Sequence, residues 1–495
     1  MLAFITGGYF EEPRVVATCA VWGLVLVLAF VSPRPLPASR AGWAVLGGLC
    51  LITAWTAISF AWAPLPSAAT DNLVRLLLYV GTLIAAIAVL RDQRAARALE
   101  PALAAGTAIV IGYGLAGRLV PGMIDMVASS RADGRLEQPI TYWNGEGALA
   151  AMGMVLCARL AGDSSRPLWM RSLASATSVP LALGAYLSYS RGAIAAALIG
   201  LVVLVAAAPS QSQLRAAATT FFGGVLTAAA SVALPGVASL RGTADERVTD
   251  GAVMLVILAV VMTAAGLLET WMGSGERSGR LRASTLAVAR RLPAVAVAAL
   301  VLAFAGLVAS GLAERSVAER PSEVRGPARL TSVDSRRYDY WKVGVDAFAE
   351  KPLQGVGSGG FRTVWLRERP VAGYALEVHS LPLEMAVELG LVGLLGFAIF
   401  LGGLIGAARR ALTAERLAAA GPVAATIVFL LHSSIDWDWQ IPAVTLPGIL
   451  LLAALVALAE RRPRSDGLED LIAQGWHFNG APDDAPRSAT ASPAG

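Results

Sequence analysis

The chain has 495 residues, of which 56% are hydrophobic and only 15% are charged, and its formal net charge is +5. Soluble globular domains carry about 25% charged residues, so the composition argues against a soluble fold. The arginines are scattered through short segments, which is typical of membrane topology signals rather than of a surface that binds nucleic acid. Cys19, Cys50 and Cys157 form no metal-binding or disulfide pattern, and we expect them to be packing residues.

Apolar runs long enough to cross a bilayer follow one another along the chain. Lipid offers no hydrogen bonds to the backbone, and the runs are continuous rather than alternating, so they are predicted to be helices. The expected fold is an all-α polytopic membrane protein with about twelve or thirteen spanning helices. The expected spans lie near residues 15–31, 42–62, 73–90, 101–120, 142–161, 172–189, 192–208, 214–236, 248–268, 292–313, 383–407, 420–435 and 442–460.

Arginines cluster in alternate connections between these helices, and such clusters mark the cytoplasmic side. The C-terminus is therefore expected to be cytoplasmic, and the one long polar loop is expected to face outward. The predicted organisation is four segments: N-terminal helices (1–313), an outward loop (314–380), C-terminal helices (381–462) and a disordered cytoplasmic tail (463–495).

The outward loop contains an amphipathic pattern. Apolar side chains recur at helical spacing within Ser335–Glu350, and Pro352 ends the pattern. The predicted apolar face consists of Tyr338, Trp341, Val345 and Phe348. Four glycines then predict a flexible turn: Gly355, Gly357, Gly359 and Gly360. This turn follows a helix and has no βαβ context, so it is not a nucleotide-binding loop.

Several arginines lie where membrane statistics do not explain them. Arg191 sits between two apolar runs on the outward side, where it either extends toward lipid head groups or forms an anion site. Arg336 and Arg337 open the loop helix, an unfavourable place for cations unless an anion is bound there; otherwise they are a solvated pair. Arg75, at the outer end of the third expected span, is a weaker case of the same kind.

Other polar residues join these arginines at the expected outer face. His379 ends the outward loop directly before a spanning helix, and a histidine pKa near 6.5 suits a general base, although a lone loop histidine is often without a role. Asp436 and Asp438 lie between two helices, where they either orient a histidine or an arginine or serve as turn residues. Asn144 and Glu146 open the fifth expected span and are candidates for contacts with sugar hydroxyls.

These residues occur in motifs that resemble those of the bacterial O-antigen ligase and polymerase superfamily. His379-Ser380, followed after nine residues by Gly390-Leu391-Val392-Gly393, matches the pattern H-[NSQ]-x9-G-x-x-G. The resemblance covers roughly residues 140–460. The other matching segments, in chain order, are Ser190–Gly192, Arg337–Trp341, Lys351–Gly357 and His432–Asp438.

The resemblance implies a metal-independent transferase without a cofactor, in the bacterial inner membrane, with its active site facing outward. The implied donor is a glycan on undecaprenyl diphosphate, and the implied acceptor is a glycan, lipid or protein hydroxyl. Arg191 and Arg337, with Arg336 and Arg75, would hold the diphosphate; His379 would activate or position the acceptor, and Asp436 would orient that site. Candidate contacts to sugar or acceptor are Asn144, Glu146, Ser380 and His432.

Alternatives remain open at this stage. Within the same superfamily, a repeat-unit polymerase or a protein O-oligosaccharyltransferase has the same histidine motif. A transporter of the lipid-linked glycan is an alternative from another class, but it should have internal repeats and charges near the middle of the membrane, and the sequence has neither feature.

Overall fold

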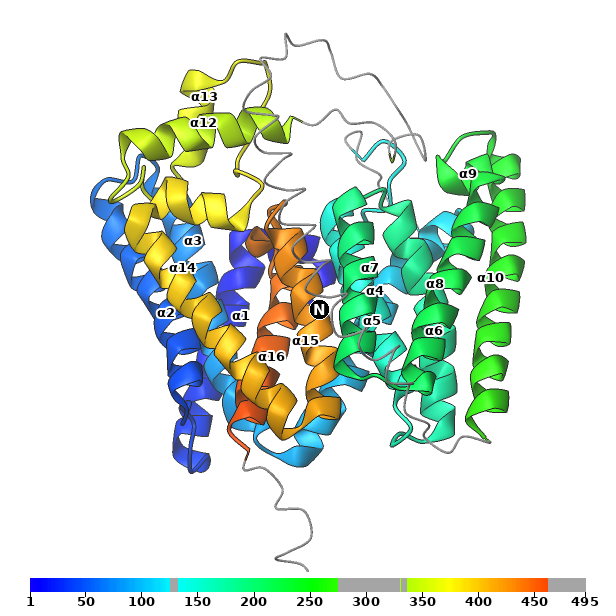
Figure 1. Ribbon diagram of the computed structural model, residues 1–495. Helices are drawn as coiled ribbons and strands as arrows, with labels where there is room; N and C mark the ends of the chain where they lie inside the picture. Colours follow the sequence, from blue (N-terminus) through cyan, green and yellow to red (C-terminus); the bar gives the residue numbers. More distant parts are fainter. Residues whose placement is uncertain (125–131, 275–329, 331–335, 462–495) are drawn as a thin grey trace, which may run out of the picture. The chain divides into compact units, whose positions relative to one another are not determined.

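The computed structural model describes residues 1–124, 132–274, 330 and 336–461, and within these ranges the regular elements are helices and no strand occurs (Figure 1). The described residues belong to one compact unit, Met1–Arg461. The expected span at 292–313, most of the outward loop before residue 336 and the expected tail at 463–495 lie outside the described residues.

Each expected span within the described residues corresponds to one helix. Eight of the described helices are long and apolar enough to cross a membrane, and α7 is a shorter apolar helix. The chain is therefore an all-α polytopic membrane protein. The helices are α1 (Glu11–Val31), α2 (Arg40–Ile58), α3 (Pro66–Leu90), α4 (Gln93–Leu119), α5 (Trp143–Gly162), α6 (Leu168–Leu187), α7 (Arg191–Ala207), α8 (Gln211–Val232), α9 (Pro235–Ala238), α10 (Ala244–Gly273), α12 (Arg337–Glu350), α13 (Phe361–Glu368), α14 (Leu381–Ala414), α15 (Arg416–Ser433) and α16 (Pro442–Ala459).

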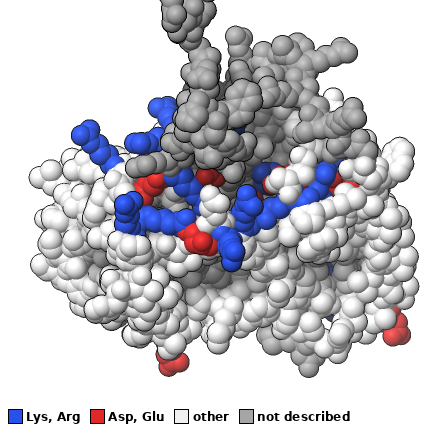
Figure 2. Space-filling view, turned by 90° about the horizontal axis from the view of Figure 1, so that it is seen from below, with Lys and Arg blue, Asp and Glu red and all other residues white. Residues whose placement is uncertain are grey.

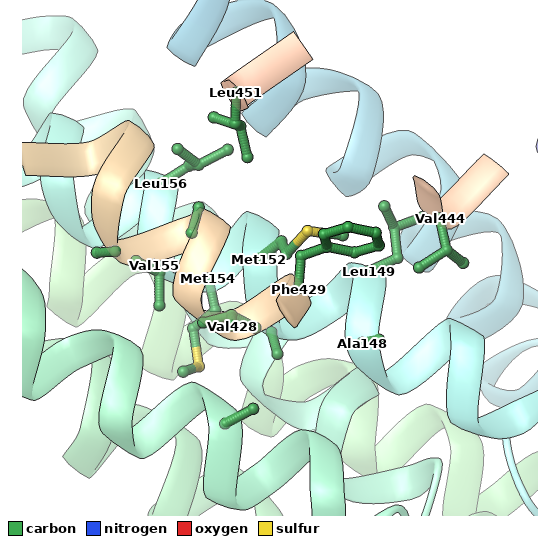
Figure 3. Close-up of a cluster of buried hydrophobic side chains, with 14 of the residues drawn as sticks. Ala148, Leu149, Met152, Met154, Val155, Leu156, Val428, Phe429, Val444 and Leu451 are labelled. Carbon is green, nitrogen blue, oxygen red and sulfur yellow. The ribbon is translucent and has the colours of Figure 1, made fainter. Parts of the chain in front are cut away.

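Helix α5 lies at the centre of the bundle, and its residues from Gly145 to Gly162 are all buried. Its apolar side chains pack against α15 and α16, where Phe429 lies among Leu149, Met152 and Val444 (Figure 3). Because lipid tails are as apolar as these side chains, close van der Waals packing rather than water exclusion holds such helices together. The beginning of α5 is thereby fixed against the C-terminal helices, which matters for the site described below.

Helices α2 and α14 pack closely through small residues. A Cβ atom on Gly48 would lie 2.5 Å from the backbone nitrogen of Phe400, and one on Gly403 would lie 2.6 Å from that of Val45. Small residues allow two membrane helices to approach at backbone distance. This contact holds α14 in place beside the N-terminal helices, and α14 begins directly after His379.

Helix α14 is broken at Gly390, whose φ of 64° lies in a region that favours glycine. The break frees backbone groups, and the segment after α12 satisfies them. The N–H of Val356 donates to the carbonyl of Val387 at 2.8 Å, and the N–H of Leu391 donates to the carbonyl of Pro352 at 2.8 Å. Non-helical backbone inside a membrane protein requires such partners. The motif that begins at His379 and the segment Lys351–Gly357 are therefore in direct contact, because the helix break at Gly390 hydrogen-bonds to that segment.

Two expectations for the loop need correction. The glycine turn is not a flexible element: Gly357 packs against the backbone of Ala63, and the N–H of Gly359 donates to the Glu388 carboxylate at 2.7 Å. The apolar face of α12 is also shifted, since Val345 is exposed while Trp341, Val343, Gly344 and Ala347 are buried. The buried face of α12 packs against α13 in a small separate hydrophobic core. The spacing of apolar residues within α12 alone does not indicate this contact.

The expectation that all three cysteines are packing residues also needs correction. Cys157 is buried in α5, whereas Cys19 and Cys50 are exposed on α1 and α2. On a membrane helix an apolar side chain is compatible with a lipid-facing surface as well as with a packed one, so a position inside an apolar run does not distinguish the two.

Arginines gather at the end of the bundle seen in Figure 2, which lies opposite α12 and α13. Many of them join the ends of different helices. Arg91 pairs with Glu460 at 2.6 Å, Arg461 pairs with Glu415 at 3.1 Å, and Arg416 donates to the carbonyl of Ala207 at 2.7 Å. We refer to this region as the arginine end.

Candidate active site

The opposite end of the bundle contains a cavity of about 1090 Å³, which we call the main cavity. Its walls come from segments far apart in the sequence: the N-terminal residues, the starts of α5, α7 and α12, the residues before α14, and the connection between α15 and α16. The lining includes five of the residues selected from the sequence, namely Asn144, Arg191, Arg336, Arg337 and His379.

Arg337 is held by a buried network. Its guanidinium pairs with Asp436, whose side chain is fully buried, and Asp436 also accepts a hydrogen bond from the Tyr142 hydroxyl at 2.5 Å. Asn144 in turn donates to the Tyr142 oxygen at 2.9 Å. Burial acts to raise the pKa of Asp436, but the Arg337 guanidinium outweighs it, so the pKa is lowered and the carboxylate stays charged. The network fixes one cation at the cavity wall while leaving about a quarter of its side chain exposed.

His379 has a backbone φ of 60°, and its ring lies between Tyr340 and Trp437, with ring centroids 5.1 and 5.9 Å away. Its Nδ1 lies 2.9 Å from the Glu377 carbonyl oxygen. Because a carbonyl only accepts hydrogen bonds, Nδ1 carries the proton and Nε2 carries a lone pair. Burial lowers the pKa of His379 to about 4, so the ring is neutral at pH 7. A neutral imidazole with Nε2 unprotonated is the form that a general base requires.

Arg191 begins α7, next to a second polar network. Ser190 caps this helix by accepting from the N–H of Ala193 at 3.3 Å. The Ser190 hydroxyl also lies 3.2 Å from Nε2 of His432, whose Nδ1 is 2.5 Å from the Asp438 carboxylate. The chain of contacts connects the start of α7 to the α15–α16 connection and thereby positions Arg191 at the main cavity.

The other selected residues do not line the main cavity. Asp436 and His432 are buried behind it and act through Arg337 and Ser190. Glu146 and Ser380 are buried as well. Arg75 lines a smaller neighbouring cavity of about 260 Å³, which we call the second cavity.

Sequence reasoning missed several residues of the site. Tyr9 and Phe10 line both cavities. The residues before them pack against Ile140 and the start of α16, and no motif in the sequence indicates this. Glu377 also lines both, and burial raises its pKa to about 8. Arg135 lies 3.5 Å over the ring of Trp143 and lines the main cavity. The only sequence feature that indicates these residues is their charged or aromatic character next to the expected outer ends of spans.

Comparison with known proteins agrees with the motif resemblance. A family model for the O-antigen ligase domain (Wzy_C) matches residues 248–398, a segment that includes α12, His379 and the helix break at Gly390. No protein in a search of curated sequences matches the chain. The family match covers less than a third of the chain and supports membership of the O-antigen ligase superfamily, whose members are glycosyltransferase-like enzymes.

Proposed function

We propose that this protein transfers a glycan from undecaprenyl diphosphate to an acceptor hydroxyl, as an O-antigen ligase does. One observation carries the proposal: four arginines (Arg135, Arg191, Arg336 and Arg337) and His379, from distant parts of the chain, line the main cavity. The arginines supply positive charge for an anionic carrier, and the histidine supplies a base for an alcohol.

Arg191, Arg336 and Arg337 are proposed to bind the diphosphate. A guanidinium group donates two parallel hydrogen bonds and keeps its charge, which suits phosphate oxygens. During transfer the bond between the anomeric carbon and the phosphate oxygen breaks, and negative charge develops on the leaving diphosphate. Fixed cations at that position stabilise the transition state more than the ground state, which is the condition for catalysis. In this scheme arginines, rather than a metal ion, carry the counter-charge.

His379 is proposed to activate the acceptor. Its Nε2 has no hydrogen-bond partner among the described residues, since the contacts there involve Nδ1 and the ring faces. Nε2 takes the proton of the acceptor hydroxyl, the oxygen attacks the anomeric carbon, and undecaprenyl diphosphate leaves with the electron pair of the broken bond. A single displacement of this kind inverts the anomeric configuration.

The membrane orientation is part of the proposal. Arginine-rich ends of membrane proteins face the cytoplasm, which supports a cytoplasmic arginine end and C-terminus in the inner membrane. The main cavity then opens to the periplasm or the cell exterior, where a lipid-linked donor needs no further energy source because its diphosphate is already an activated leaving group.

The test is transfer by purified protein in detergent, with a lipid-diphosphate-linked glycan as donor. Candidate acceptors are lipid A–core, a growing repeat-unit glycan and a protein, and EDTA is present throughout. Wild type is compared with His379→Ala and Arg191→Ala, and with Lys342→Ala as control, because Lys342 is exposed on α12 and lies outside the main cavity. We expect EDTA-resistant product from wild type and Lys342→Ala only.

The productive acceptor would distinguish a ligase from a polymerase or a protein transferase. Full activity in both His379→Ala and Arg191→Ala would refute the assigned roles. Specific binding of the lipid carrier without transfer to any acceptor would instead favour a transporter of the lipid-linked glycan.

A further inference from the structure

The second cavity adjoins the main cavity but has a different chemical character. Both are lined by Tyr9, Phe10 and Glu377, so these three residues form the partition between them. The remaining lining of the second cavity comes from the starts of α1 and α3 and from α13: Glu11, Arg14, Asp71, Asn72, Arg75 and Arg362. None of the diphosphate arginines proposed above belongs to it.

Arginines and acidic side chains occur in equal numbers around the second cavity. Arg14 pairs with Asp71 at 2.7 Å, and Arg362 pairs with Glu377 at 3.3 Å. Arg75 is only 3% exposed, donates to the Asn72 side-chain oxygen at 2.8 Å, and makes no ion pair with any described residue. Three arginines and three acidic side chains line the second cavity, whereas four arginines and one acidic side chain, Glu377, line the main cavity, so the second cavity is the less suited of the two to a diphosphate.

The lining of the second cavity combines hydrogen-bond donors and acceptors. Arg14, Arg75 and Arg362 carry guanidinium groups, which only donate. The carboxylates of Glu11, Asp71 and Glu377 accept, and the Asn72 amide does both. A ligand that serves both donors and acceptors has hydroxyl groups, because each hydroxyl does both.

The aromatic partition suits the same ligand. Tyr9 and Phe10 pack edge to face with ring centroids 5.8 Å apart, and they offer apolar surface next to the charged groups. A sugar ring has C–H faces and a hydroxyl edge, so it matches an aromatic wall beside paired charges. The volume of about 260 Å³ lies just below the roughly 300–1,000 Å³ typical of ligand pockets, which favours a single ring over a longer chain.

We propose that the second cavity is a subsite for one sugar residue of the acceptor, remote from the hydroxyl that reacts. The inference rests on the proposed transfer reaction. Tyr9 contacts Trp437 with centroids 5.6 Å apart, and Trp437 contacts His379, so the partition leads to the proposed base. An acceptor whose hydroxyl lies at His379 thus has the second cavity as a neighbour, while the donor diphosphate lies with Arg191, Arg336 and Arg337. Arg75 is a specificity residue for the acceptor in this assignment, not a diphosphate ligand.

The first test measures sugar binding without any transfer. Saturation-transfer NMR on the detergent-purified protein would use methyl glucoside, methyl galactoside and methyl mannoside, with inorganic phosphate as competitor. We expect a signal from at least one glycoside that phosphate does not displace, that Arg75→Gln and Asp71→Asn weaken, and that Lys342→Ala leaves unchanged. Asp71→Asn serves as a second variant because its side chain is 38% exposed and tolerates the change more readily than buried Arg75. Displacement by phosphate, or no signal from any glycoside, would overturn the proposal.

The second test uses the acceptor found active in the transfer assay, intact and trimmed of its non-reacting sugars. Arg75→Gln is expected to raise the acceptor KM about tenfold with the intact acceptor, to leave the donor KM within about twofold, and to have no effect with the trimmed acceptor. A raised donor KM, or equal losses with both acceptors, would overturn the assignment. Failure of wild type to transfer would reject the proposed function itself, while the NMR experiment would still decide whether the cavity binds a sugar.

Discussion

Arginines occur at both ends of the helix bundle, but their surroundings differ. At the arginine end, the side chains meet carboxylates and backbone carbonyls of neighbouring helices, as in the pair between Arg171 and Glu269 at 2.5 Å. At the other end, Arg191, Arg336 and Arg337 line a cavity of about 1090 Å³. The first arrangement joins helix ends; the second presents charge to a space large enough for a substrate.

The difference shows what an arginine contributes in each setting. A buried cation without a partner costs free energy. At the arginine end, Arg91, Arg171 and Arg461 avoid this cost because each pairs with a carboxylate. Arg337 is an intermediate case, because Asp436 fixes it from behind while part of its side chain stays exposed in the cavity. Such an arrangement keeps a cation in one geometry before the substrate arrives, which electrostatic stabilisation of a transition state requires.

The largest expected effect is at His379. Replacement by alanine removes the proposed base, and general base catalysis contributes about 10²–10⁴-fold to a rate. We therefore expect kcat to fall by about that factor, with the donor KM nearly unchanged, in steady-state transfer assays. Lys342→Ala, on an exposed part of α12 outside the main cavity, provides the comparison, and equal rates for His379→Ala and Lys342→Ala would show that His379 is not the base.

A smaller effect is expected from the pair of Arg337 and Asp436. Arg337→Lys keeps the charge but loses the planar two-pronged donor, and Asp436→Asn keeps the shape but loses the counter-charge. Each change should lower kcat/KM by about 10²-fold, and the double variant should lose less than the product of the two, because both act on one guanidinium. Fully multiplicative losses would show that Asp436 acts independently of Arg337.

The pH dependence offers a milder test. Burial lowers the pKa of His379 to about 4, and only the unprotonated ring accepts a proton. As pH falls, activity is lost where the ring becomes protonated, so kcat/KM should stay nearly flat from pH 8 to pH 5.5. A histidine at its ordinary pKa near 6.5 would already lose about tenfold at pH 5.5. A tenfold loss there would indicate that the ring is more solvated than its packing between Tyr340 and Trp437 suggests.

The sequence was sufficient for the helices and for the main chemical groups, but not for their arrangement. Long apolar runs predict spans, because lipid leaves few alternatives for the backbone. The motif with His379 was recognisable, yet the reason for Gly390 appears only when the segment after Lys351 is seen docked into the helix break. Contacts between distant segments carry no local pattern, and this is also why Tyr9 went unnoticed.

The candidate residues divide in the same way. Arg191 and Arg337 were selected because charge at a membrane surface needs an explanation, and both line the main cavity. Arg75 was selected by the same argument but lies in the second cavity, because spacing along a helix gives the depth of a residue and not the neighbour it faces. His432 matched a motif, yet it is buried against Asp438 and Ser190, where its role is to position the start of α7.

The smallest expected effect is at the arginine end. Arg91→Ala removes the pair with Glu460, which is 6% exposed, and leaves that carboxylate without its cation. We expect a loss of about 1 kcal/mol in stability, seen as a melting temperature lower by a few degrees in detergent, because the pair is only partly buried. Transfer rates at a temperature where the variant is folded should stay within about twofold of wild type. A large loss of kcat/KM in folded Arg91→Ala would mean that the arginine end is coupled to catalysis, and the separation of a structural end from a reactive end would then fail.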